Sequence, residues 1–243
     1  MKKILVISDS LFLLQNFYRI CEERHYNKEQ FDIRFCASNK AFLERYKGRT
    51  DIGPISIKES VEAILKTYDL VLSLHCNDKL PAILVNQLPC VNLHPGYNPC
   101  NRGKFPYVFS ILNKKALGVT LHLMDEELDH GPIIVRKKLE IEAWDTMDTL
   151  YDKLLQLEVE VLEAHIESLL NGTFTTFLPE EEGNINYAKD FHQLKALDLE
   201  QEMTLGEAID LLRALTHKDI NNAYFYDSKK NKVFVKIFLD KEN

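Results

Sequence analysis

The sequence predicts an α/β protein with a Rossmann-like, mostly parallel sheet that carries helices on both faces. Three short apolar runs, at residues 2–7, 31–36 and 70–74, have the length and composition of buried strands. Segments with apolar residues at helical spacing lie between them, at residues 11–23 and 58–66. Strands that alternate with helices are typical of parallel sheets, in which ligands bind beyond the carboxyl ends of the strands.

The chain continues this alternation for another hundred residues. Strands are expected over residues 91–94 and 118–124 and again from residue 133, with a short helix over residues 105–112. Residues 146–170 form a long amphipathic pattern. This helix either covers the sheet or forms part of a dimer seam.

A small C-terminal region with helix and hairpin follows the acidic stretch at residues 180–183. Thr204 and Glu207 have the spacing of a capping box, which predicts a helix over residues 204–215. Two short strands, at residues 223–226 and 233–238, predict a β-hairpin. We therefore expect a main domain of residues 1–178 and a small α+β region of residues 179–243 that packs on it.

Composition excludes several functional classes. The net charge of −7 provides no overall attraction for nucleic acid. No apolar run approaches the ~20 residues of a membrane span, and the first residues do not resemble a signal peptide. The five cysteines form no CxxC pair, and their spacing to nearby histidines matches no metal site. We expect a cytoplasmic protein without a metal, a nucleic-acid partner or a membrane partner.

The turn after the first strand argues against a dinucleotide cofactor. It reads Ser8-Asp9-Ser10, without the glycines that let a backbone approach a pyrophosphate. Ser10 stands where a helix begins. It either caps that helix or binds a phosphate through its hydroxyl and the backbone donors.

One short stretch, Val91 to Pro99, carries the clearest signal of a site. Asn92 and His94 alternate with apolar residues, so on an extended chain both side chains point to the same side. Alone, this pattern fits either a polar site or two satisfied polar groups at a strand end. Among the acids of residues 125–129, Asp129 differs because it precedes a Gly-Pro turn that leads into the next strand.

Together these residues resemble a known family. Asn92-Leu93-His94-Pro95-Gly96, followed by Leu128-Asp129-His130-Gly131-Pro132-Ile133, resembles the formyltransferases that use 10-formyltetrahydrofolate. The resemblance covers most of residues 1–170, so residues 1–178 would be the catalytic domain. Further motifs are similar to the sugar-nucleotide N-formyltransferases, which act on dTDP-linked amino-dideoxy sugars. These are His94-Pro95-Gly96-Tyr97-Asn98-Pro99, Asn101-Arg102-Gly103, Phe105-Pro106 and Phe109-Ser110-Ile111, with residues 186–190, 212–215 and 222–225 in the tail.

The resemblance implies that Asn92, His94 and Asp129 are catalytic. In formyl transfer an amine attacks the formyl carbon and an oxyanion develops. The amide of Asn92 can donate to that oxyanion. His94 can stabilise the oxyanion or act as general base, and Asp129 can orient the imidazole and help a proton reach the leaving folate nitrogen. The reaction needs no metal, covalent nucleophile or redox cofactor.

The resemblance also implies where the two substrates bind. The folate is expected to contact Asp78, Lys79, Leu80, Met124, Asp125 and Asp129. The sugar nucleotide is expected to contact Ser10, Asn77, Tyr97, Asn98, Arg102, Asn222 and Tyr224. Within these sets, Leu80 and Met124 fit ordinary core packing equally well, and Tyr224 is either a platform for thymine or a plain strand aromatic.

Related activities remain as alternatives. A formyltransferase for methionyl-tRNA would need a basic C-terminal module, whereas residues 180–243 carry 13 acidic and 9 basic residues. An enzyme for glycinamide ribonucleotide would need a glycine-rich phosphate loop near residue 10. We expect dTDP-4-amino-4,6-dideoxy-D-glucose as substrate and a homodimer, with the product used in a surface polysaccharide such as the O-antigen of lipopolysaccharide. A dTDP-3-amino-3,6-dideoxy sugar, or a non-catalytic folate- or nucleotide-binding module, is the alternative.

Overall fold

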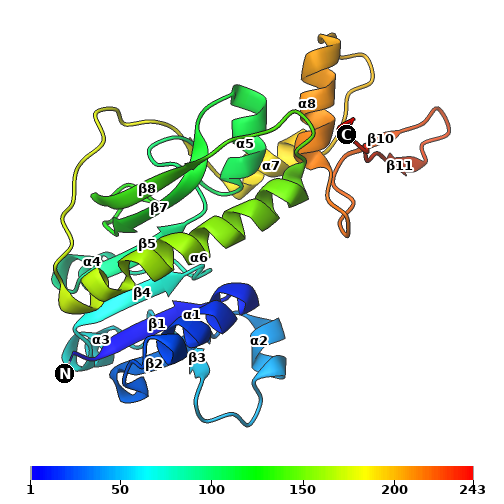
Figure 1. Cartoon of the computed structure of the whole chain (residues 1–243). Helices are drawn as coiled ribbons and strands as arrows, with labels where there is room; N and C mark the ends of the chain where they lie inside the picture. Colours follow the sequence, from blue (N-terminus) through cyan, green and yellow to red (C-terminus); the bar gives the residue numbers. More distant parts are fainter. Residues whose placement is uncertain (1, 243) are drawn as a thin grey trace.

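The computed structural model describes residues 2–242 and places a seven-stranded mixed sheet at the centre of the molecule (Figure 1). The strands lie in the order β3-β2-β1-β4-β5-β7-β8. The first five run parallel, β7 pairs antiparallel with β5, and β8 pairs antiparallel with β7, so that β7 alone runs against the other six; this mostly parallel sheet confirms the predicted fold class. The strands are β1 (Ile4–Ser8), β2 (Phe31–Cys36), β3 (Gly53–Ile55), β4 (Leu70–Leu74), β5 (Cys90–His94), β7 (Leu117–Leu123) and β8 (Ile133–Leu139).

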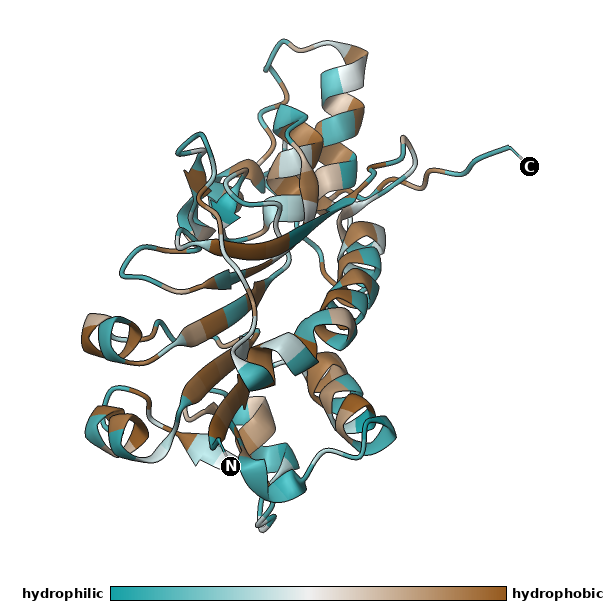
Figure 2. Ribbon diagram, turned by 60° about the vertical axis from the view of Figure 1, so that its left-hand side comes forward, coloured by the Kyte–Doolittle hydropathy of each residue, from teal (hydrophilic) through white to brown (hydrophobic). Residues whose placement is uncertain are grey.

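Helices cover both faces of the sheet because its central strands are apolar on both sides. In β1, Ile4 and Val6 pack into one core while Leu5 and Ile7 pack into the other. Figure 2 shows the apolar strands enclosed between helices with a polar outer side. One core is covered by α1 (Leu11–Glu23), α2 (Lys40–Arg45), α5 (Pro106–Asn113) and α6 (Met147–Asn171), the other by α3 (Val61–Thr67) and α4 (Ala82–Gln87).

The helix ends follow the local signals of the sequence. Ser10 is the N-cap of α1, and its hydroxyl accepts a hydrogen bond from Leu13 N at 3.4 Å. The long helix α6 begins after Thr146 and ends at Gly172, whose φ of 71° lies in the left-handed region. In the part of the chain that the structure describes, no helix is both long and apolar enough to cross a membrane.

Short elements were missed by the sequence patterns. The strand β3 and the helices α2 and α4 span only three or six residues, which is too short for a clear period. The helix expected from residue 58 begins at Val61 instead. The two strands of the hairpin, β10 (Tyr224–Tyr226) and β11 (Lys232–Phe234), pair as expected but are shorter.

The C-terminal region returns to the main domain before it forms its own helices. Strand β9 (Ile185–Asn186) pairs in parallel with β6 (Arg102–Gly103), in the loop that follows β5. It leads into α7 (Ala188–Leu194) and α8 (Leu205–Leu215), whose predicted capping box between Thr204 and Glu207 is confirmed. The domain boundary after residue 178 stays a prediction.

Candidate active site

A pocket of about 520 Å³ opens at the carboxyl ends of β4 and β5. The strand β5 contributes Asn92 and His94, and the loop before β8 contributes Asp129. The three residues singled out from the sequence therefore lie in one cavity, at the edge of a parallel sheet where ligands usually bind.

Asp129 is the centre of the polar contacts in this pocket. Its two carboxylate oxygens accept hydrogen bonds from Asn92 Nδ2 and from the backbone N–H of Gly103, each at 3.1 Å. Nδ1 of His94 and Nε2 of His122 each lie 3.6 Å from it. Burial raises the pKa of this carboxyl, but the nearby His94 imidazole and the hydrogen bonds from Gly103 N–H and Asn92 Nδ2 outweigh burial and hold the pKa well below its usual range. Asp129 is therefore ionised at neutral pH.

His94 is neutral in this environment. Its side chain is 6% exposed, and burial lowers its pKa to about 4. With the Nδ1 side facing Asp129, Nε2 has no hydrogen-bond partner in residues 2–242. A Cβ atom on Gly96 would stand only 2.4 Å from this Nε2, so glycine is needed for the loop to pass the ring.

Asn92 is held from two sides. Its Oδ1 accepts a hydrogen bond from Ser73 Oγ at 2.8 Å, and its Nδ2 donates to Asp129 and, at 3.3 Å, to Nε2 of His122. His122 Nδ1 lies 2.8 Å from the carbonyl oxygen of Leu123, which leaves Nε2 as the acceptor. The alternation along its strand predicts a structural histidine on a half-buried face at His122, whereas the residue is 1% exposed and belongs to this cluster.

Two predicted substrate residues support the loop of Asp129 instead of lining the main pocket. Asn98 Nδ2 donates to the main-chain oxygen of Asp129, whose φ of 49° is left-handed. Arg102 is 5% exposed and pairs with Glu182 at 2.6 Å. Asn98, Arg102 and Asp129 border a neighbouring hollow of about 260 Å³. Tyr97 lies under the guanidinium of Arg136, with 4.6 Å from Cζ to the ring centroid.

The residues expected to contact the folate line the same pocket as Asn92 and His94. Asp9 holds the loop after β4 in place beside the segment that follows β2. Its carboxylate accepts hydrogen bonds from Cys36 N, Asn39 Nδ2 and Asn77 N at 2.8 to 3.1 Å. The expected residues found here are Asp78, Lys79, Leu80, Met124 and Asp125, together with Asn77 from the expected substrate set.

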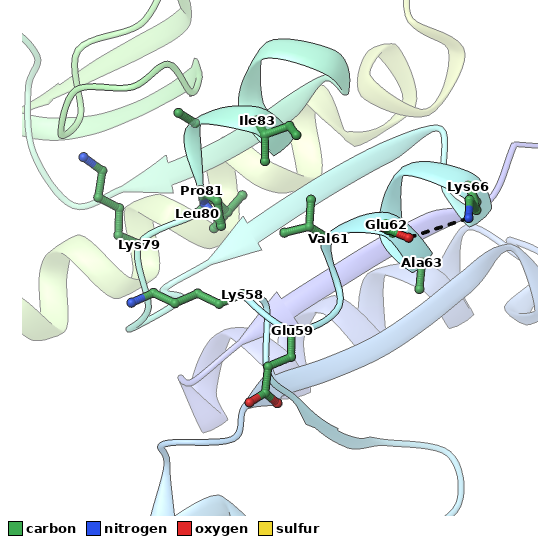
Figure 3. A pocket seen from close by; sticks show the side chains of 11 residues that line it. Lys58, Glu59, Val61, Glu62, Ala63, Lys66, Lys79, Leu80, Pro81 and Ile83 are labelled. Atoms are coloured by element: carbon green, nitrogen blue, oxygen red, sulfur yellow. Dashed lines mark ion pairs between the residues drawn. The ribbon is translucent and has the colours of Figure 1, made fainter.

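Lys79 and Leu80 also border a second groove, of about 970 Å³, between α3 and α4 (Figure 3). In this groove Lys66 pairs with Glu62 at 3.8 Å, while Lys58 and Lys79 extend toward the same end. Leu80 is 2% exposed and packs with the apolar core on that face of the sheet. The loop of Lys79 and Leu80 therefore separates two hollows.

Three predicted substrate residues lie apart from the pocket. Ser10 caps α1. Asn222 is buried and donates to the carbonyl oxygen of Leu215 at 3.2 Å. Tyr224 belongs to the C-terminal hairpin, where the ammonium of Lys232 lies 3.6 Å from its ring centroid. Their contact with a nucleotide stays a prediction.

Another wall of the pocket was not foreseen from the sequence. It is formed by side chains from the start of α5 and the first half of α6, namely Lys104, Phe105, Tyr107 and Tyr151. The helical spacing indicated that these helices exist, but not that they border the site. His75 also lines the pocket, at the start of the polar loop after β4, where a ligand wall is expected at the carboxyl end of a strand.

Two groups of side chains have the composition of metal ligands. Asp9, Cys36 and Cys76 form one, and Glu127, His130 and Glu182 the other, with ligand atoms within 4.8 Å of one another. In both groups the side chains already bond to neighbours, as Asp9 does to backbone N–H groups and His130 to Asp125. The proposed chemistry uses neither group.

Comparisons with known proteins agree with this geometry. Residues 58–166 match the formyl transferase family, and residues 190–241 match the N-formyltransferase dimerization C-terminal domain. A dTDP-4-amino-4,6-dideoxyglucose formyltransferase of Mycobacterium tuberculosis is 46% identical over 186 residues, which cover 76% of this chain and 80% of the relative.

Solved structures extend the likeness over the whole chain. A 4-N formyltransferase from Francisella tularensis superposes with a TM-score of 0.92 at 38% identity, over 99% of both chains. An N-formyltransferase from Helicobacter canadensis, in complex with folinic acid and dTDP-3-aminofucose, shares the fold at 21% identity, with a TM-score of 0.77 over 94% of this chain and 85% of that one. The chain therefore belongs to the formyltransferase family, in the branch of the sugar N-formyltransferases.

Proposed function

We propose that this enzyme transfers the formyl group of 10-formyltetrahydrofolate to the 4-amino group of dTDP-4-amino-4,6-dideoxyglucose. The observation that carries the proposal is the convergence of Asn92, His94 and the ionised Asp129 in one pocket at the sheet edge. The 46% identity to an enzyme named for this activity supports the choice of substrate.

The chemistry follows from the protonation states of the three residues. The sugar nitrogen attacks the formyl carbon, the bond from that carbon to the folate nitrogen breaks, and one proton passes from the amine to the leaving nitrogen. Asn92 exchanges its bond to His122 for one to the oxyanion, a donor of a kind that stabilises such a transition state by about 3 kcal/mol. His94, whose neutral ring lines the pocket, accepts a hydrogen bond from the amine and so directs the nitrogen lone pair to the carbon. Asp129 holds both side chains in place.

The two substrates approach from different walls of the pocket. We assign the folate to the loop of Asp78, Lys79 and Leu80 and to Met124 and Asp125, as the resemblance implies. The wall of Lys104, Phe105, Tyr107 and Tyr151 is then left for the sugar nucleotide, with aromatic faces and one cation for an anionic substrate.

The C-terminal region is proposed to join two copies of the chain. Residues 190–241 match a dimerization domain, and this segment exposes large apolar side chains that a monomer leaves in water. Phe238 is 88% exposed and Leu205 is 78% exposed. We also place the enzyme in the cytoplasm, where its five free cysteines stay reduced, and its product in the synthesis of a surface polysaccharide such as O-antigen.

The test is turnover on a substrate panel. The purified protein is incubated with 10-formyltetrahydrofolate and either dTDP-4-amino-4,6-dideoxyglucose or a dTDP-3-amino-3,6-dideoxy sugar, and the products are analysed by mass spectrometry. We expect a mass gain of one formyl group on the 4-amino sugar, with the higher kcat/KM. Preference for the 3-amino sugar would contradict the substrate, and binding of both ligands without turnover would mean a non-catalytic module.

A further inference from the structure

A buried carboxylate lies beside the pocket and has no part in the three-residue chemistry. Glu158 is in the middle of α6, and its side chain is fully buried against the sheet. A carboxylate in an apolar interior is costly unless it is paired. Its Oε1 lies 2.8 Å from Nε2 of His75, while Oε2 has no hydrogen-bond partner in the described chain. The apolar packing of the helix gives no reason for an acid at this position.

His75 is held so that its ring meets both the carboxylate and the pocket. It directly follows β4, with a φ of 61°, which residues other than glycine rarely adopt. The side chain is 17% exposed and lines the same cavity as Asn92 and His94. With Nε2 held by Glu158, Nδ1 is the nitrogen left for a ligand in the cavity.

His94 and His75, which both line the pocket, have opposite environments. Burial lowers the pKa of His94 to about 4, so His94 is a weak base. Burial also lowers the pKa of His75, but the charge and the hydrogen bond of Glu158 outweigh this and raise it above its ordinary value. The charge of Lys104, which lies before α5, opposes this rise in the pKa of His75. Tyr151 also senses the pair, because burial and the charge of Glu158 raise its own pKa. Pairs of titratable groups with diverging environments divide the acid and base roles of a site.

We propose that His75, oriented by Glu158, is the general base that deprotonates the ammonium form of the amino sugar before it attacks. The proposal rests on the proposed function. Nε2–H donates to Glu158, and the lone pair of Nδ1 takes one proton from the ammonium, which frees the electron pair that forms the bond to the formyl carbon. A second proton leaves the same nitrogen for the folate nitrogen when its bond to carbon breaks. The proton on His75 then passes to solvent.

The decisive measurement is the pH dependence of kcat/KM for the amino sugar. Glu158→Gln keeps the size of the side chain and removes its charge. The acidic limb of this variant's pH profile should move to lower pH by about one unit or more. An opposite charge at this distance raises the pKa of an imidazole such as His75 by roughly that amount. His75→Gln should lower kcat/KM by at least ~100-fold at pH 7 and recover part of it at high pH, where the amine is already neutral. The dissociation constant of dTDP should not change.

The control is Glu163→Gln on the same helix, which removes a partly exposed carboxylate that pairs with Arg19. Its pH profile should match that of the wild type. Wild-type activity and an unmoved acidic limb in both His75→Gln and Glu158→Gln would overturn the inference while leaving the proposed function intact. Failure of the wild type to formylate any amino sugar would instead refute the proposed function. Thermal unfolding shows whether each variant is folded, and His75→Gln, at the pocket edge, decides the question if Glu158→Gln is not.

Discussion

Asn92 and His122 are direct partners across the antiparallel pair of β5 and β7, and both approach the carboxylate of Asp129. Asn92 Nδ2 lies 3.3 Å from Nε2 of His122. The orientation of the Asn92 amide is therefore set by a side chain that is 30 residues away in the chain. His122 is thus a fourth member of the polar group formed by Asn92, His94 and Asp129.

Replacement of His122 should reduce catalysis more than binding. In His122→Leu the ring nitrogens are lost but the apolar volume is largely kept, so Asn92 loses one acceptor. We expect kcat to fall about 10- to 100-fold, the range for residues that orient a catalytic group, with KM values near those of the wild type. Steady-state kinetics measure this. The control is His165→Gln, on α6, whose Nδ1 is bonded only to its own helix. A fully active His122→Leu would remove His122 from the cluster.

Truncation of His94 should separate chemistry from nucleotide binding. In His94→Ala the unpartnered Nε2 is lost, and formyl transfer should fall by at least ~100-fold, as for other positioned acid–base groups. Titration calorimetry with dTDP should give an unchanged dissociation constant. Near-wild-type turnover by this variant would refute the catalytic assignment.

The burial of His94 also affects stability. Its pKa is about 4 in the folded protein and about 6.5 in an unfolded chain. Between these values the unfolded state binds more protons, so stability falls as the pH is lowered. The loss should amount to about 2 kcal/mol between pH 7 and pH 5. Urea unfolding at both pH values should show this loss in the wild type and its absence in His94→Gln. Equal losses in both proteins would mean that folding does not lower the pKa of His94.

Gly96 should tolerate no side chain. An alanine Cβ would stand 2.4 Å from Nε2 of His94 and would push the ring out of place. We expect kcat of Gly96→Ala to fall by at least ~10-fold, as when a reacting group is misplaced. The matched control is Gly206→Ala in α8, where the added Cβ meets Thr204 only at 3.9 Å. That variant should keep wild-type kcat, and a parallel loss in both would argue against a clash with His94.

The dimer prediction can be tested at the most exposed apolar side chain of the C-terminal region. Phe238→Glu should shift the protein toward monomer, because a charge would be buried in the proposed interface. Light scattering after gel filtration measures the mass. Leu178→Glu changes a side chain that is 70% exposed but lies before the dimerization domain, and it should remain dimeric. A wild-type protein that is monomeric at all concentrations would contradict the assignment.

The sequence predicted the elements whose signals are local. The period of apolar residues and the cap at Ser10 placed α1 at its observed bounds. Asn92 and His94 were placed together because both lie on one strand, and the alternation of side chains needs no tertiary information. Asp129 was joined to them by family resemblance, since its 37-residue separation from Asn92 offers no local signal.

The residues that were missed depend on contacts between distant segments. His122 meets Asn92 through the register of an antiparallel pair, and Glu158 meets His75 through the packing of α6 on the sheet. Neither relationship leaves a periodic pattern. Asn222 resembled a family motif, but a motif does not show whether an amide faces a ligand or, as here, the carbonyl oxygen of Leu215.

The pairing of β6 with β9 has a consequence for exchanging parts between relatives. Gly183 passes so close to Pro99 that a Cβ would overlap the Pro99 carbonyl oxygen, and the amide of Asn184 donates to Asn101. The segment of residues 182–186 therefore packs closely against the loop after β5, in which Gly103 N–H donates a hydrogen bond to Asp129. A chimera that takes a new C-terminal arm should cross over after residue 187. A junction at residue 178 would pair a foreign segment 182–186 with the native loop after β5.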